Sequence, residues 1–126
     1  MQNMIFVCLG GALGSGARYW ISLALPNDPS HGLPYGTLTV NFIGSLCLTF
    51  LLFTSSTHWN LSEHTRLFLT VGLLGGFTTY STFNHEVLTF LDRGALGWAA
   101  IYLLTTMLAC LFGGGLGMTL GRWTAG

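Results

Sequence analysis

The chain has 126 residues, of which 51% are hydrophobic and 6% are Asp, Glu, Lys or Arg. Soluble domains carry about 25% charged residues, so this composition excludes an ordinary soluble protein and favours a membrane protein. Because the formal net charge is zero, we expect no basic surface for a phosphate backbone and therefore no nucleic-acid partner.

The few charged residues leave long uncharged stretches, at residues 29–62, 67–85 and 94–121. About 20 residues of apolar helix cross the hydrocarbon core of a bilayer. The sequence therefore predicts an all-α membrane protein that forms a single transmembrane domain, residues 1–126. The four expected transmembrane helices cover about residues 3–25, 36–57, 62–91 and 95–121.

The first predicted helix, 3–25, is interrupted by Arg18 and ends before the turn-forming run from Pro26 to Pro29. A secretory signal would begin with basic residues, but residues 1–3 carry none, so we expect this helix to be retained. An arginine at the centre of a membrane helix costs about 2.5–3.5 kcal/mol on insertion. We therefore expect Arg18 to face water or an anion.

The third predicted helix, 62–91, follows a polar stretch. A capping box formed by Asn60 and Glu63 is expected at its start, in preference to the weaker pair of Ser62 and Thr65. This pattern predicts that the helix begins between residues 61 and 63.

The same helix contains Gly75 and Gly76, followed closely by four hydroxyl-bearing residues, Thr78, Thr79, Ser81 and Thr82. Two glycines cost about 2 kcal/mol of helix propensity relative to alanine, and hydroxyl groups compete for backbone carbonyls. In lipid, a break is tolerated only where protein, water or an ion binds the freed backbone groups. We therefore expect a broken helix and a functional site at this point.

The fourth predicted helix, 95–121, carries Tyr102, Thr106 and Cys110 at a spacing of four, which places them on one face. These side chains either bind an ion in succession along the helix or are ordinary polar groups of a membrane helix. Glycines also recur at a spacing of four, which favours close helix packing: Gly10 and Gly14, Gly72 and Gly76, and Gly113, Gly117 and Gly121.

The arginines are balanced between the two ends of the predicted bundle. Four helices place both termini at one end with Arg66 and Arg122, and leave Arg93 and Arg18 for the other end. Because an imbalance of Lys and Arg sets membrane orientation, we expect insertion in both orientations. The sequence thus predicts an antiparallel, dual-topology homodimer, since one such bundle is also too thin to enclose a pore.

The polar groups within the apolar helices are mostly hydrogen-bond donors. Asn41, Glu86 and Arg18 either tie helices together or contact an ion. Tyr80 and Phe83 share a helical face, and an aromatic ring presents a positive edge to an anion. Donors without acceptors favour an anion. Fluoride is the simplest candidate, with chloride or a weak acid left open by the residues alone.

Three motifs carry a specific resemblance over nearly the whole chain: GGALGSGARY at 10–19, GTLTVNFIG at 36–44 and GLLGGFTTYSTF at 72–83. On these motifs the sequence resembles the Fluc (CrcB) family of bacterial fluoride channels. The resemblance implies a channel and not an enzyme, located in the bacterial plasma (inner) membrane. It also implies an antiparallel dimer with two pores that passively exports fluoride from the cytoplasm.

The resemblance further assigns roles to residues. A structural sodium ion, which is not transported, would be held by backbone carbonyls of Gly75 and Thr78. Asn41 resembles the pore asparagine of the family, Phe83 its second pore phenylalanine and Arg18 its vestibule arginine. The polar track on the last helix corresponds to Tyr102, Thr106 and Cys110.

Two positions depart from the family pattern, since Tyr80 stands where phenylalanine is usual and Cys110 where serine is usual. Glu86 is placed in the ion pathway, either against the ion or as a tie between helices. The alternative function is a small dual-topology, proton-coupled multidrug exporter, which would need a carboxylate in its first helix. A haem or quinone anchor would need paired axial histidines deep in the bilayer, whereas His85 stands alone.

Overall fold

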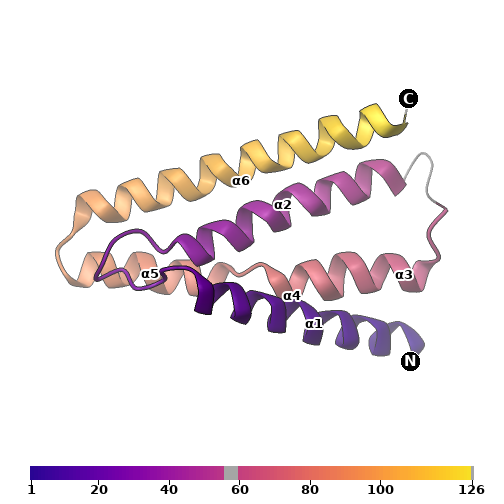
Figure 1. Ribbon diagram of the computed structural model, residues 1–126, viewed down its shortest axis with the longest axis horizontal. Coiled ribbons are helices and arrows are strands. Elements are labelled where there is room, and N and C mark those ends of the chain that lie inside the picture. The colour runs from indigo at the N-terminus through magenta and orange to yellow at the C-terminus, as the bar shows by residue number, and fades with distance from the viewer. Residues whose placement is uncertain (56–59, 126) are drawn as a thin grey trace.

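The computed structural model describes residues 1–55 and 60–125, and the elements within these ranges are all helical. Most of the helical segments run along the long axis of the molecule, and the labelled ends of the chain lie at the same end of the bundle (Figure 1). The elements in chain order are α1 (Gln2–Ala24), α2 (Tyr35–Ser55), α3 (Glu63–Leu67), the π-helical η1 (Phe68–Leu74), α4 (Gly75–Phe77), α5 (Tyr80–Asp92) and α6 (Leu96–Ala125).

Within the described part of the chain, three helices are long and apolar enough to cross a membrane, namely Gln2–Ala24, Tyr35–Thr54 and Leu96–Thr124. The remaining segment, expected at 62–91, is divided among α3, η1, α4 and α5, so no single helix in it reaches that length. The expected end of the second helix at residue 57 lies outside the described residues. The last helix runs four residues past the expected 121, because Gly121 packs against Phe53 of α2 instead of ending the helix.

Glycines bring the helices together in two pairs, α1 with η1 and α4, and α2 with α6. A Cβ atom on Gly14 would lie 2.0 Å from the carbonyl oxygen of Leu73 in η1, and one on Gly117 would lie 2.2 Å from that of Leu46 in α2. A side chain at either position would collide with backbone. The prediction that glycines at a spacing of four allow close packing is therefore confirmed.

Ser62 caps the start of α3, because its hydroxyl oxygen accepts a hydrogen bond from the N–H of Thr65 at 3.2 Å. The expected capping box of Asn60 and Glu63 is therefore wrong. The carboxylate of Glu63 is instead engaged by another helix, where it accepts a hydrogen bond from Nδ2 of Asn3 at 3.0 Å. Its helical position fits the macrodipole, since an acidic residue in the first turn is favourable.

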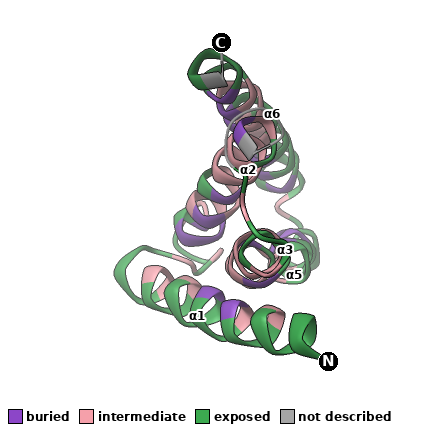
Figure 2. Ribbon diagram, turned by 90° about the vertical axis from the view of Figure 1, so that its right-hand side faces the viewer, coloured by how far each residue is buried: buried purple, intermediate pink, exposed green. Residues whose placement is uncertain are grey.

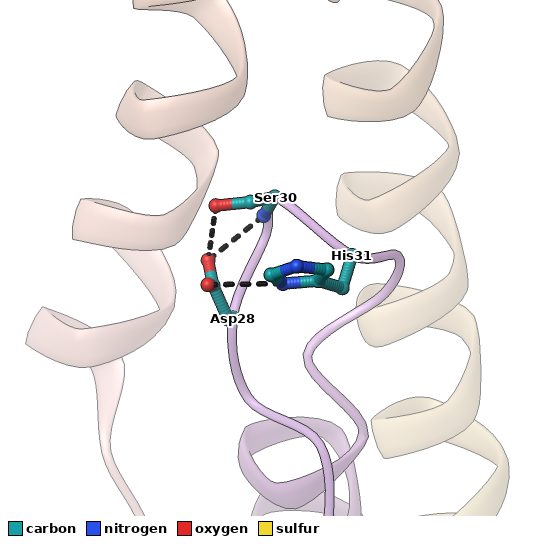
Figure 3. A network of polar contacts seen from close by, with 3 residues as sticks. All are labelled: Asp28, Ser30 and His31. Carbon is teal, nitrogen blue, oxygen red and sulfur yellow. Dashed lines mark hydrogen bonds and ion pairs between the residues drawn. The ribbon is translucent and has the colours of Figure 1, made fainter.

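A small polar network orders the connection between α1 and α2 (Figure 3). One carboxylate oxygen of Asp28 accepts hydrogen bonds from the backbone N–H (2.9 Å) and the hydroxyl group of Ser30, and the other lies 3.1 Å from Nδ1 of His31. The Ser30 hydroxyl and N–H, assisted by His31, lower the pKa of Asp28 below its usual value. The loop thus keeps a carboxylate at the end of the bundle opposite the termini.

An apolar cluster is buried between α5 and α6. It consists of Phe83, Val87, Phe90, Ala99 and Tyr102. By contrast, much of the surface of α1 is exposed (Figure 2), and so are large apolar side chains such as Leu111 and Phe112 of α6. Lipid or another copy of the chain is needed to cover this apolar surface.

Candidate functional site at the helix break

The segment between α4 and α5 leaves the helical conformation for two residues. Thr78 and Thr79 have extended backbone, with φ/ψ of −80°/158° and −150°/122°. The hydroxyl group of Thr78 donates to the carbonyl of Leu74 at 3.0 Å, and that of Thr79 caps α5 by accepting the N–H of Thr82 at 3.2 Å. The hydroxyl residues that favoured a break in the sequence therefore satisfy backbone groups on both sides of it.

Asn41 of α2 holds this extended segment with both ends of its carboxamide. Its Nδ2 donates to the carbonyl of Thr79 at 2.9 Å, and its Oδ1 accepts the N–H of Thr79 at 2.8 Å. One of the two N–H groups expected to face an ion is therefore used on the backbone, and the other is left over. Gly44, one turn further, makes room for the Thr78 methyl group, which would lie 2.0 Å from a Cβ at that position.

The break separates backbone carbonyls from their usual helical partners, those of Gly75 and Gly76 among them. In a continuous helix the Gly75 carbonyl would accept the N–H of Thr79, but that N–H is bonded to Asn41. The Gly76 carbonyl instead accepts hydrogen bonds from α1, from Nε of Arg18 at 3.2 Å and from the hydroxyl of Ser15 at 3.5 Å. Arg18, expected to face water or an anion, thus donates its Nε–H to backbone.

A cavity of about 380 Å³ opens beside the break. Its walls come from α2, η1, α4, α5, α6 and the extended segment, and most of its lining is apolar with a few polar groups. The lining residues are Asn41, Gly44, Ser45, Leu48, Thr70, Leu74, Gly75, Thr78, Thr79, Tyr80, Phe83, Thr106, Met107 and Cys110. The structure therefore brings together seven of the ten residues selected from the sequence: Asn41, Gly75, Thr78, Tyr80, Phe83, Thr106 and Cys110.

Glu86 and Tyr102 lie behind the cavity wall and not in it. Their side chains are 5% and 0% exposed. The two carboxylate oxygens of Glu86 accept hydrogen bonds from the hydroxyl groups of Thr37 at 2.8 Å and Tyr102 at 2.6 Å. Glu86 thus joins α2, α5 and α6, and Tyr102 supports the ring of Phe83 with 5.2 Å between ring centroids.

Thr37 is a residue that sequence reasoning did not select. It lies four residues before Asn41, so the two side chains share one face of α2. This spacing, which places the Thr37 hydroxyl one helical turn from the amide of Asn41, was the feature of the sequence that could have identified Thr37. Its partner on α5 could not be inferred, because the sequence does not show which helices meet.

Thr106, Tyr80 and Phe83, which carry hydrogen-bond donors or aromatic rings, all line the cavity. The hydroxyl oxygen of Thr106, a residue only 5% exposed, has no hydrogen-bond partner within the described residues. Burying such a group without a partner costs free energy, so a bound ligand that accepts its hydrogen bond would be favoured. Tyr80 and Phe83 approach edge to face, with 5.9 Å between their centroids, and ring edges carry partial positive charge.

Within residues 1–55 and 60–125 the structure brings no three His, Cys, Asp or Glu side chains together to hold a metal ion. The three cysteines are unpaired thiols. A cation at this site would therefore be bound by uncharged oxygens, those of the backbone or of hydroxyl and amide side chains, and Gly75 and Thr78 both line the cavity. Unwound carbonyls of this kind hold sodium ions in other membrane proteins, so the residues present fit such an ion.

Comparisons with known proteins agree with the motifs. A family model described as "CrcB-like protein, Camphor Resistance (CrcB)" matches residues 5–118. Proteins named "Fluoride-specific ion channel FluC" are similar along their whole length in Anaeromyxobacter dehalogenans (45% identical) and Chloroflexus aurantiacus (40%), each covering 100% of both chains. A third, from Allorhizobium ampelinum, is 38% identical over 98% of each chain. The chain therefore belongs to the CrcB family.

Proposed function

We propose that this chain is a fluoride-selective channel of a bacterial plasma membrane, through which fluoride leaves the cytoplasm down its electrochemical gradient. The observation that carries the proposal is the cavity at the helix break, where the unpartnered hydroxyl of Thr106 and the ring edges of Phe83 and Tyr80 meet. The described lining includes no carboxylate. The relatives named above, all fluoride-specific channels by name, support the same ion.

The mechanism follows from what a small anion loses when it leaves water. Its hydration shell must be replaced by close donors, or entry into lipid is prohibitively costly. The Thr106 hydroxyl, the remaining N–H of Asn41 and the ring edges would supply that replacement in turn. Because Asn41 is fixed to Thr79 at both ends of its carboxamide, its free N–H has a defined direction. Cys110 extends the donor line with a weak S–H donor.

The working unit is proposed to be an antiparallel homodimer with two pores. Each chain would cross the membrane four times, with α1, α2 and α6 as continuous helices and the segment from α3 to α5 as a broken third span. Both termini at one end, balanced arginines and exposed apolar side chains on a single chain support this arrangement. The cavity, formed by only part of one bundle, would then be completed by the second copy.

The proposed sodium ion would sit where the two copies meet and would be structural. The carbonyls of Gly75 and Thr78 would hold it, two from each chain. The Thr78 carbonyl is available for a cation because the N–H of Thr82, its partner in a continuous helix, bonds instead to the hydroxyl of Thr79. When bound, the ion would take the place of the hydrogen-bond donors that these carbonyls lose at the break.

The exporter alternative has less support from the geometry. Proton-coupled export needs a carboxylate that meets the substrate, whereas both oxygens of Glu86 are occupied by hydroxyl groups behind the cavity wall. No observation in the described part of the chain favours export of a large organic cation over passage of a small anion.

The test is ion efflux from liposomes that contain the purified protein and potassium fluoride. With valinomycin present to carry potassium, we expect rapid fluoride release recorded by a fluoride electrode, and chloride release at the level of protein-free liposomes. Equal efflux of chloride and fluoride would contradict the selectivity. Absence of fluoride efflux from a folded, dimeric sample would contradict the channel.

A further inference from the structure

The side of the break that faces away from the cavity is held by α1. This helix lies across the broken segment from α2 and α6 (Figure 2), and the cavity lining contains no residue of α1. Two α1 side chains one turn apart, Ser15 and Arg18, meet at a single atom, the carbonyl oxygen of Gly76, at 3.5 and 3.2 Å. Backbone groups at the break are thus hydrogen-bonded from two sides, by Asn41 of α2 and by Ser15 and Arg18 of α1.

The Gly76 carbonyl needs a partner of this kind. In a continuous helix it would accept the N–H of Tyr80, but Tyr80 begins the next helix beyond two extended residues. An unsatisfied carbonyl costs several kcal/mol in lipid. A cationic donor is also suited to the position, because residues 63–77 form a helical run that ends there, and the C-terminus of a helix attracts positive charge.

The arginine is not committed elsewhere to an acid. Within the described ranges, His31 and Asp28 form the only ion pair, so no carboxylate there pairs with Arg18. Its approach is fixed by backbone contact between α1 and α4, since a Cβ on Gly76 would lie 2.6 Å from the carbonyl oxygen of Gly11. The close contact between the two backbones therefore fixes the position from which the guanidinium group of Arg18 reaches the break.

The carbonyl groups at the end of α4 belong to two consecutive glycines, Gly75 and Gly76, so their orientation depends on what they bond to. Glycine restricts φ and ψ little, so the peptide planes around Gly75 and Gly76 can rotate unless something holds them. Ser15 and Arg18 hold the second carbonyl toward α1. The peptide before it, which carries the Gly75 carbonyl, is then left with fewer orientations, and Gly75 lies on the cavity wall.

We propose that Arg18 and Ser15 are positioning residues for the cation at the helix break. By holding the Gly76 carbonyl, they set the direction of the Gly75 carbonyl, which binds the ion. This inference rests on the proposed sodium site. It assigns Arg18 to the outer shell of a cation, where the sequence alone suggested that it faces water or an anion. Outer-shell groups that orient a metal ligand typically change metal affinity 10–100-fold when removed.

The test is a sodium titration of the purified dimer in potassium at constant ionic strength, with thermal unfolding as the readout. We expect Arg18→Gln and Arg18→Lys to raise the sodium concentration for half-maximal stabilisation about tenfold. Lysine keeps the charge but lacks the planar donor. Ser15→Ala should give a smaller rise. Arg122→Gln, at the end of α6, is the matched control and should titrate like the wild type.

A second readout separates this role from an anion-gathering role. The fluoride concentration for half-maximal flux should stay near the wild-type value in Ser15→Ala. If Arg18→Gln instead raises that fluoride concentration and leaves the sodium titration unchanged, the proposal is overturned. Ser15→Ala, which removes only a hydroxyl group, carries the same sodium test if the Arg18 variants do not form dimers.

The proposed function and this inference fail in different ways. A wild-type dimer that is stabilised by sodium but passes no fluoride would contradict the channel while leaving the positioning role supported by the Arg18 variants. A wild-type dimer indifferent to sodium over potassium would overturn the positioning role, even if fluoride passes.

Discussion

At the scale of single residues, two phenylalanines of α5 differ in their relation to the cavity. Phe83 lines the cavity, while Phe90 belongs to the same buried cluster and lies outside the cavity wall. Both contact the ring of Tyr102, with centroid distances of 5.2 and 5.9 Å. This pair makes it possible to separate the effect of a ring edge in the ion path from the effect of core packing.

Phe83→Ile should reduce fluoride flux about tenfold or more, because loss of a ring-edge contact of about 1.4 kcal/mol in the barrier corresponds to that factor. The dimer should persist, since isoleucine remains apolar. Phe90→Ile is the matched control, with a similar loss of packing and flux close to the wild type. Liposome efflux and size-exclusion chromatography measure the two properties. Equal flux in both variants would remove the ring from the mechanism.

Residue identity predicted which side chains gather at the cavity better than it predicted their partners. Asn41, Thr106 and Phe83 were recognisable as polar or aromatic groups within apolar helices, and they line one cavity. The bonds of Asn41 to Thr79, and of Glu86 to Thr37 and Tyr102, were not foreseeable. A polar group in lipid must find some partner, but the sequence leaves open which one.

At the scale of helices, glycines determine how closely the elements approach. Gly14→Ala should destabilise the fold by about 1–3 kcal/mol through overpacking, since the new Cβ would lie 2.0 Å from a backbone oxygen. Gly16→Ala is the control on the same helix, because no described atom other than those of the adjacent residues and the nearby backbone of α1 lies within 4 Å of a Cβ there. Thermal unfolding in detergent measures the difference, and equal loss in the two variants would contradict direct contact between α1 and η1.

The helix pattern could be predicted as far as local chemistry reaches. Uncharged stretches located α2 and α6 to within a few residues, and the apolar run that ends before Pro26 located α1. The Gly75–Gly76 pair lies just before the place where α4 gives way to extended backbone. Two local details differed. The cap of α3 is Ser62 because Glu63 is drawn to Asn3 of α1, and Arg18 turns to a freed carbonyl. Both differences arise from contacts between helices, which spacing along one helix does not contain.

At the scale of the whole molecule, the balance of positive charge should control assembly. His31→Arg with Asp92→Arg adds positive charge at the end opposite the termini, which should fix one orientation. An antiparallel dimer then cannot form, and we expect fluoride flux to be lost. Co-expression with His64→Arg and Trp123→Arg, which bias the chain the other way, should restore it. Flux from the first variant alone would contradict an antiparallel unit.

The length of α6 has a consequence for the membrane around the protein. Its 30 residues span about 45 Å at 1.5 Å per residue, against a hydrocarbon thickness of about 30 Å. The helix must therefore tilt from the bilayer normal or project beyond the acyl chains. Arg122 lies over the ring of Phe53 at 5.1 Å, next to the exposed Trp123, a pairing suited to the headgroup layer. The thickness of the bilayer should therefore influence the tilt of α6 and, through their contact, of α2.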